Sequence, residues 1–476
     1  MSATGDVDLE AFRAEAHRLV DWITRYLAEN ERLPVLSRVR PGDVRDALPA
    51  VPPTQAEPLS DFLADVERVI VPGLTHWNHP SFFAYFANSA TAPGILGEML
   101  SAAFNANAML WKTSPAATEL EILVLDWLRQ MMGLPRALFG VIHDTASTST
   151  LVALAAAREA VPGLEARRRG LVGQARLRMY ASEHAHSSVE KAGIVLGIGQ
   201  DGFRAIPSDD AFRMDAAALA RAIAEDRAAG FTPFAVTATV GTTSTTSVDE
   251  VPAIADICER EGLWLHVDAA YGGAAAVAPE LRFVMAGADR ADSIVVNPHK
   301  WLFVPVDLSV LYTRRPEVMK SAFSLVPEYL RTAEDEIAPN FMDYGVSLGR
   351  RFRALKLWMV IRAFGTEGIA ARVREHVRLA RVFRSWLEAD PRFEIAAPTP
   401  LSVVCFRAVP SRGGDAERLN EAVMDAVNAT GEAYISHTKL RGRTTLRLAI
   451  GNVRTEERHV RRAYERLGEA VDRLAS

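Results

Sequence analysis

A lysine close to a predicted strand is the first residue whose type suggests chemistry. Only six of the 54 lysine and arginine side chains in this chain are lysines. Lys300 lies in the run Asn297–Trp301, directly after the apolar residues Ser293–Val296, which predict a strand. An amine can act as a nucleophile toward a carbonyl group, whereas a guanidinium stays protonated. The neighbouring His299 and Trp301 would desolvate the amine and lower its pKa. The alternative is a surface lysine in a turn.

An aspartate forms the second candidate. Asp268 follows the predicted strand Leu263–Val267, and the small residue Ala270 comes two positions later. A carboxylate at a strand end can keep a pyridinium nitrogen protonated, and Ala270 leaves room for a flat ring. A metal ligand, a helix cap or a buried ion pair would explain Asp268 alone equally well. The position of Lys300, about one strand-and-turn unit later, makes the pair more informative than either residue.

Two further polar segments lie between a predicted strand and a helix. Asp144–Thr150 is rich in small and hydroxyl residues and opens the predicted helix Ser147–Ala160. Free N–H groups and the helix dipole can bind a phosphate there, although simple capping is an alternative. Ser182–Ser188 contains His184 and His186. Either histidine could stack on an aromatic cofactor, or cap a helix, and the residue types alone leave this choice open.

Other motifs and the composition argue against several classes of protein. His184 and His186 have no third ligand at a metal-binding spacing, and no Gly-rich dinucleotide fingerprint follows a strand, so we expect no metal. The formal net charge of -5 argues against nucleic-acid or anionic-membrane binding. Cys258 and Cys405 lie in apolar stretches and are expected to be buried thiols. The first ten residues lack the features of a secretory signal, so a cytoplasmic location is expected.

These candidate residues are distributed along an alternating pattern of helices and strands. Helices are predicted at Pro93–Asn105, Pro115–Met132, Ser147–Ala160, Asp215–Ala229 and Val251–Glu261. Short apolar runs predict strands at Leu177–Ala181, Phe234–Val240, Leu263–Val267, Ser293–Val296 and Leu308–Thr313. This alternation indicates an α/β fold with a mostly parallel sheet flanked by helices. Ligands of such sheets bind at the carboxyl ends of the strands, where the candidate residues lie.

Smaller parts are predicted before and after this region. Leu9–Leu27 and Ser60–Val71, the latter with Ser60 as N-cap, predict two helices that are too few to bury their own apolar face. From about Gly365, an amphipathic helix toward Leu387 precedes an α+β pattern, with strands at Ser402–Arg407, Ala433–His437 and Thr444–Ile450 and helices at Asp415–Asn428 and Thr455–Leu474. We therefore predict an N-terminal helical arm (residues 1–85), a large domain (86–365) and a small C-terminal α+β domain (366–476).

Taken together, several runs resemble the group II decarboxylases that depend on pyridoxal 5′-phosphate (PLP), and most of all the aromatic-L-amino-acid decarboxylases. The resemblance rests on Asn-Pro-His-Lys-Trp at 297–301, His-Val-Asp-Ala-Ala-Tyr at 266–271 and Ala-His-Ser-Ser at 185–188. It is supported by Thr75–Trp77 and Phe82–Phe86, and by the run Leu348–Trp358. The similarity extends from about Phe12 to Ala470, which is nearly the whole chain.

The resemblance implies a type I PLP-dependent transferase fold and a homodimer that exchanges the N-terminal arm, with the site at the interface. It implies that Lys300 carries the cofactor, that Asp268 pairs with the pyridine nitrogen, and that His186 rather than His184 stacks on the ring. It also implies further cofactor contacts from Ala270, Thr145, Ala146, Ser147, Thr243, Asn297 and His299. The substrate pocket would include Trp77, Tyr85 and Phe86.

The chain departs from the family pattern at three places. Two apolar pocket positions that the partner subunit supplies in the family are Asn107 and Met109 here. The family's Pro-Thr after the Tyr-Phe pair is replaced by residues 87–88, Ala-Asn. In the segment Leu330–Val346, which is a mobile loop in the family, the catalytic tyrosine aligns with Phe341, and Tyr344 takes the place of a tryptophan.

The expected activity is decarboxylation of an aromatic L-amino acid to the arylalkylamine and CO2. Phe341 also suggests an aromatic acetaldehyde synthase, which consumes O2 and releases aldehyde, ammonia and hydrogen peroxide. A PLP-binding protein without turnover is a third reading, and the intact Lys300, Asp268 and His186 argue against it. The sequence does not select one aromatic amino acid as the substrate.

Overall fold

A seven-stranded sheet forms the centre of the larger part of the molecule. The computed structural model describes residues 6–325, 334, 337–410 and 414–474. The strand order is β1-β7-β6-β5-β4-β2-β3, and every strand except β7 runs in the same direction. The strands are β1 Phe139–His143, β2 Leu177–Ser182, β3 Phe203–Ile206, β4 Thr232–Thr239, β5 Trp264–Asp268, β6 Ser293–Val296 and β7 Ser309–Thr313.

Helices cover both faces of this sheet, which explains why its strands are apolar on both sides. One core lies under α7 Ala146–Glu159, α9 Ser188–Val195 and α13 Pro316–Phe323. The other core lies under α6 Pro115–Met131, α10 Ala216–Ala228, α11 Val251–Glu261 and the first part of α14. The expected α/β class with a mostly parallel sheet is confirmed.

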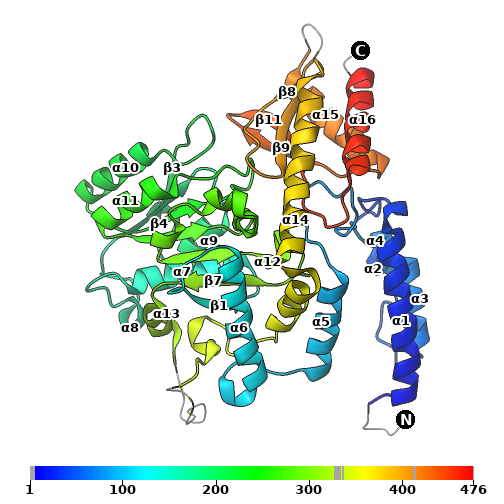
Figure 1. Cartoon of the computed structure of the whole chain (residues 1–476), viewed down its shortest axis with the longest axis horizontal. Helices are drawn as coiled ribbons and strands as arrows, with labels where there is room; N and C mark the ends of the chain where they lie inside the picture. The colour runs from blue at the N-terminus through cyan, green and yellow to red at the C-terminus, as the bar shows by residue number, and fades with distance from the viewer. Residues whose placement is uncertain (1–5, 326–333, 335–336, 411–413, 475–476) are drawn as a thin grey trace.

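A small antiparallel sheet, in the order β10-β11-β9-β8, forms a second layer with its own core. Its strands are β8 Phe393–Ile395, β9 Val403–Ala408, β10 Ser436–Leu440 and β11 Arg443–Ala449. It is covered by α15 Ala416–Thr430 and α16 Glu457–Leu474. The long helix α14, Ala354–Glu388, extends from the large sheet to the small one (Figure 1).

The N-terminal segment lies at one side of the molecule, outside both sheets (Figure 1). It contains α1 Leu9–Glu29, α2 Asp43–Asp46, α3 Leu59–Asp65 and α4 Val71–Gly73, and α5 Ala92–Phe104 follows. No residue of α1 is buried, and Phe12 is 57% exposed. The first turns of this helix, with Leu9 and Phe12, are therefore left exposed, whereas Trp22, Ile23, Tyr26 and Leu27 are partly covered by the rest of the chain. The exact domain limits stay predictions.

Several predicted elements need correction. Ser60 does not cap a helix, because α3 begins at Leu59 after Pro58 and then changes to a π-helical turn at Val66–Ile70. α14 consists of two helices joined at Gly365, whose backbone is not helical (φ 64°), so the boundary predicted at Gly365 is present, and the helix before it, from Ala354, was not predicted. The strand predicted at Ala433–His437 is shifted to Ser436–Leu440, because Tyr434 instead bridges to Phe82. Strands β1, β3 and β8 were not predicted.

Candidate active site

The candidate residues gather at one edge of the large sheet. Because β1, β2, β4, β5 and β6 are parallel, the loops that follow them meet at their common carboxyl edge. Lys300 lies in the short helix α12, Pro298–Trp301, which begins immediately after β6. Its backbone N–H donates to the Asn297 carbonyl at 2.9 Å.

Lys300 has an amine whose environment favours the uncharged form. Burial lowers the pKa of Lys300 from its ordinary value, the positive charge of Arg447 lowers it further, and Asp268 opposes the decrease. The Nζ atom lies 5.3 Å from the centre of the Phe86 ring. An uncharged amine is the form that attacks a carbonyl group, so this site can provide a nucleophile.

Asp268 ends β5 and is 5% exposed. Its Oδ1 accepts a hydrogen bond from the Ala270 N–H at 3.1 Å, and the rest of the carboxylate remains free to accept another donor. Asn297 is also buried, and its Oδ1 has no hydrogen-bond partner among the described residues. A buried acceptor of this kind is usually satisfied, so this position fits a bound ligand with donor groups.

Two histidines stand close to the amine, and each is held in a defined tautomer. The backbone N–H of Ser188 donates to His186 Nδ1 at 3.1 Å, so a neutral His186 carries its proton on Nε2. The pKa of His186 is lowered by partial burial and then by the Lys300 charge, while Asp268 opposes the change. The Leu308 N–H likewise donates to His299 Nδ1 at 2.8 Å, so a neutral His299 also carries its proton on Nε2. Burial lowers the pKa of His299 to about 3.

The start of α7 offers donors for an anion. Thr145 is the N-cap, and its side chain makes no capping hydrogen bond. The N–H groups of the first turn, which begins with Ala146 and Ser147, therefore lack a side-chain acceptor, and the helix dipole favours a negative charge there. Thr243 is exposed in the loop after β4, and in the described part of the chain it makes no hydrogen bond with Lys300.

Phe86, which lies beside the amine, belongs to one of two sets of stacked aromatic rings. Phe86 stacks on Tyr271 at a centroid distance of 3.8 Å. Trp77 stacks on Tyr85 at 5.9 Å, and the Tyr85 hydroxyl lies 3.2 Å from that of Tyr434. These rings provide a flat apolar surface that suits an aromatic side chain.

Arg447 is a site residue that the sequence reasoning missed. It is 4% exposed, and its guanidinium lies 4.8 Å from the centre of the Phe86 ring. It donates to the Tyr85 carbonyl and to the Ser244 carbonyl, both at 2.8 Å, while its Nη2 has no partner. An arginine inside the apolar strand β11 was the available signal, because such a charge is seldom buried without a role.

Four predicted site residues lie together elsewhere. The short 3₁₀ helix Phe341–Tyr344 packs against β1. The centre of the Phe139 ring lies 4.8 Å from that of Tyr344 and 6.1 Å from that of Phe341. The Met342 N–H donates to the Met109 carbonyl at 2.9 Å, and Asn107 accepts from the Arg350 N–H at 3.0 Å. Among the described residues, no hydrogen bond, ion pair or ring contact joins this group to Lys300. Residues 330–333 and 335–336 of the predicted loop lie outside the described residues.

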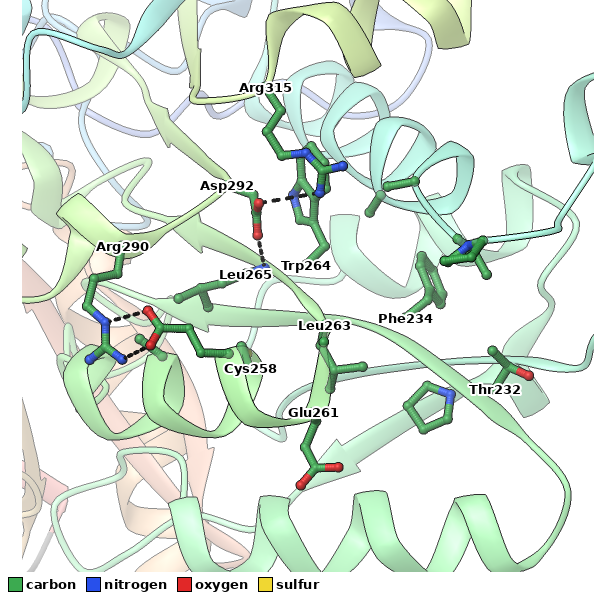
Figure 2. A pocket seen from close by; sticks show the side chains of 18 of the residues that line it. Thr232, Phe234, Cys258, Glu261, Leu263, Trp264, Leu265, Arg290, Asp292 and Arg315 are labelled. Carbon is green, nitrogen blue, oxygen red and sulfur yellow. Dashed lines mark hydrogen bonds and ion pairs between the residues drawn. The ribbon is translucent and has the colours of Figure 1, made fainter.

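A separate cavity of about 540 Å³ lies at the opposite edge of the sheet, where β4 and β5 begin (Figure 2). Most of its charged groups pair with one another. Arg290 contacts Glu259, and Arg315 contacts Asp292 at 3.7 Å (Figure 2). Neither Lys300 nor Asp268 lines this cavity, so the candidate site is the carboxyl edge.

Comparison with known proteins decides the family. The pyridoxal-dependent decarboxylase conserved domain matches residues 41–409. The chain belongs to the pyridoxal-dependent decarboxylase family. It is 42% identical to the aromatic-L-amino-acid decarboxylase of Sus scrofa over 480 residues, which cover 98% of this chain and 97% of that protein. It is 38% identical to a phenylacetaldehyde synthase of a Rosa hybrid cultivar, covering 97% and 94% of the two chains.

The crystal structure of Oryza sativa TDC with PLP and tryptamine has the same fold, with a TM-score of 0.96, 38% identity and complete coverage of both chains. The chain is thus a PLP-dependent carboxy-lyase. The carboxyl edge of this decarboxylase fits the cofactor, because it combines a buried amine, a free carboxylate, an unpartnered amide oxygen and an uncapped helix. The described residues contain no group of three or more potential metal ligands and no helix that could cross a membrane.

Proposed function

We propose that the enzyme decarboxylates an aromatic L-amino acid to the arylalkylamine and CO2. The observation that carries this proposal is the position of Lys300 Nζ over the ring of Phe86, at 5.3 Å, which is itself stacked on Tyr271. PLP, when bound, supplies an electron sink for the electron pair that CO2 leaves behind. Lys300 would hold the cofactor, and its low pKa makes the amine available for exchange with the substrate amine.

The surrounding side chains have separate proposed tasks. The Asp268 carboxylate would hold the proton on the pyridine nitrogen, which is the electrostatic support that the reaction needs. His186, with its proton on Nε2, would lie on the ring face and donate from that atom. The α7 N-terminus, with Thr145, Ala146, Ser147 and Asn297, would bind the phosphate. Ala270, Thr243 and His299 would complete the cofactor contacts, and Trp77, Tyr85 and Phe86 would bind the substrate ring.

We also propose a homodimer in which each chain completes the site of the other. Phe341–Tyr344 is buried and hydrogen bonded to Met109, which is partly exposed, and Asn107 is exposed next to it. Because this group is apart from the amine of its own chain, a partner copy is the means of bringing it to a site. The exposed apolar residues of α1 and α5 offer the interface.

Phe341 supports a second candidate function, aromatic acetaldehyde synthesis. A tyrosine at this place could deliver a proton to Cα after CO2 leaves, and phenylalanine has no such donor. O2 could then accept the electrons, so that the amino acid, O2 and water give CO2, aldehyde, ammonia and hydrogen peroxide. Tyr344, three residues later, retains a hydroxyl, and burial raises its pKa, which keeps it protonated as an acid.

Product analysis tests both candidates. The purified enzyme would be supplied under air with L-phenylalanine, L-tyrosine, L-DOPA or L-tryptophan, while CO2, amine, aldehyde, peroxide and O2 are measured together. The main proposal expects CO2 and amine in equal amounts, without O2 consumption. The second expects aldehyde and peroxide in equal amounts, with one O2 consumed for each CO2. The absence of CO2 from all four substrates would contradict both.

A further inference from the structure

A buried histidine links Lys300 to the small-sheet side of the molecule. His376 lies on α14 and is 2% exposed, and it contacts Trp301, the residue that follows Lys300. Trp301 is completely buried. Helix α14 passes beside the large sheet and continues to the small one (Figure 1). His376 thus connects a helix that runs along both sheets with the residue next to Lys300.

The contact between these two rings defines the proton on the histidine. Trp301 Nε1–H donates to His376 Nδ1 at 2.8 Å, and the rings are nearly coplanar, with an interplanar angle of 6°. Indole is a donor only, so Nδ1 must be the unprotonated nitrogen. Burial lowers the pKa of His376 to about 4, although a hydrogen bond with the backbone of Asn452 opposes the decrease. The neutral ring therefore serves as a fixed acceptor.

Trp301 in turn begins a column of stacked rings that ends under the amine. It stacks on Tyr271 at a centroid distance of 4.8 Å and an angle of 4°, and Tyr271 stacks on Phe86 at 3.8 Å. The Tyr271 hydroxyl is also bonded to Ser402 Oγ at 2.5 Å. Lys300 Nζ lies 5.3 Å from the centre of the Phe86 ring, at the end of this column. The orientation of Trp301 thus determines how the rings below the amine are supported.

The same histidine approaches the segment that supports Trp77. The side chain of Asn452 donates to the Trp77 carbonyl at 3.3 Å and to the His79 carbonyl at 3.2 Å. Three segments that are distant in sequence therefore converge on His376: the lysine helix, the 451–453 segment and the segment at Trp77.

We infer that His376 is a positioning residue, which holds Trp301 and thereby fixes the ring column that supports Phe86 and Lys300. This inference rests on the proposed function, because it assigns the cofactor to Lys300. A group that sets the geometry of reacting atoms affects rate strongly, since small displacements reduce turnover by large factors. Within the described residues, His376 itself makes no hydrogen bond or ring contact with Lys300 or Phe86.

Variants of both rings test this inference in the PLP-loaded enzyme. His376→Leu removes the acceptor, and Trp301→Phe keeps a ring but removes the donor. Each should raise the dissociation constant of PLP and lower kcat by about tenfold or more. Because both act through one hydrogen bond, the double variant should be no worse than the poorer single variant. His376→Asn places an amide oxygen near the position of Nδ1 and should restore both quantities to within about threefold.

Control variants separate this inference from general loss of stability and from the proposed function. Tyr464→Phe removes a hydrogen bond to Asp390 in the small-sheet part, at 2.8 Å, and should leave PLP affinity unchanged. Wild-type PLP affinity and kcat in Trp301→Phe would overturn the inference, even if His376→Leu does not fold. Additive effects in the double variant would also overturn it. Lys300→Ala, measured in parallel, tests the proposed function alone, since it retains the ring column.

Discussion

At the scale of single residues, Asp268 gives the sharpest electrostatic prediction. Asp268→Asn keeps the shape of the side chain but removes the charge that would hold the pyridine nitrogen protonated. We expect kcat/KM to fall. The loss should correspond to several kcal/mol of transition-state stabilisation, about the size of a major preorganised electrostatic contribution. Steady-state kinetics with saturating PLP measures this loss. A variant within about tenfold of wild type, or roughly 1.4 kcal/mol, would refute the role.

The segment Phe341–Tyr344 yields a prediction about products. If Phe341 permits oxidation, wild type should consume O2, and Phe341→Tyr should shift the product from aldehyde toward amine. If Tyr344 is the working acid instead, wild type should release only amine, and Tyr344→Phe should slow it by about 10²–10⁴-fold. Simultaneous assay of amine and peroxide in the three proteins distinguishes the cases. A wild type that forms amine, together with a fully active Tyr344→Phe, would contradict both roles.

Residue types and spacing were sufficient to predict the group at the carboxyl edge, because Lys300, Asp268 and His186 each end or follow a recognisable strand. The low pKa of Lys300 was also predicted, although its cause includes Arg447, which lies about 150 positions later in the chain. A contact of that kind depends on how the small sheet packs on the large one. Sequence spacing carries no information about such packing, and the ring column to His376 was missed for the same reason.

At the scale of elements, a buried ion pair connects the run Leu348–Trp358 to helix α6 and strand β1. Glu121 of α6 and Arg350 are 2% and 8% exposed, and they lie 2.7 Å apart. Glu121 also accepts from the Ile142 N–H at 2.9 Å, and Arg350 donates to the Ile142 carbonyl at 2.8 Å. Removing one partner leaves an uncompensated buried charge. Glu121→Ala should therefore lower the free energy of unfolding by about 3–5 kcal/mol.

Urea unfolding of the PLP-loaded protein measures this change, and a surface pair provides the matched control. Arg384 and Glu388 on α14 are paired at 2.8 Å but are 35% and 49% exposed. Glu388→Ala should change the free energy of unfolding by about 1 kcal/mol or less. Equal effects of the two alanine variants would show that the buried Glu121–Arg350 pair contributes no more to the free energy of unfolding than the exposed pair does.

Elements with a clear period were predicted best. The helix Val251–Glu261 and the strand Ser293–Val296 match the structure at both ends, because Gly262 and the turn before Ser293 limit them. Strands β3 and β8 are equally short or shorter, but each contains a charged residue and is only partly buried, so they lack the apolar run that marked Ser293–Val296. The boundary predicted at Gly365 corresponds to the break in α14, where the backbone is not helical, whereas the first part of α14, from Ala354, was not predicted.

At the scale of the whole molecule, uncovered apolar side chains support the proposed homodimer. On α1, Leu9 and Phe12 are 75% and 57% exposed, and on α5, Leu96 and Phe104 are 50% and 58% exposed. Such a surface is typical of an interface. Phe12→Asp should therefore reduce both the dimer and the activity, since each site would need its partner. Sedimentation velocity and turnover measure these effects together.

Val172 serves as the control for this prediction, because it is 96% exposed and lies far along the chain from both helices. Val172→Asp should leave the dimer and the activity unchanged. An active monomer in wild type, or a Phe12→Asp variant that stays dimeric and active, would contradict the proposed interface.

The most direct test of the account is CO2 release by Lys300→Ala. An aromatic L-amino acid labelled in its carboxyl group would be supplied to wild type, to Lys300→Ala and to a control variant of an exposed lysine, Lys439→Ala. The absorption of bound PLP would be recorded before substrate addition. We predict labelled CO2 and the absorption band of protein-bound PLP in wild type and Lys439→Ala, and loss of both in Lys300→Ala. Unchanged absorption and CO2 release in Lys300→Ala would contradict the assignment of the cofactor to this lysine.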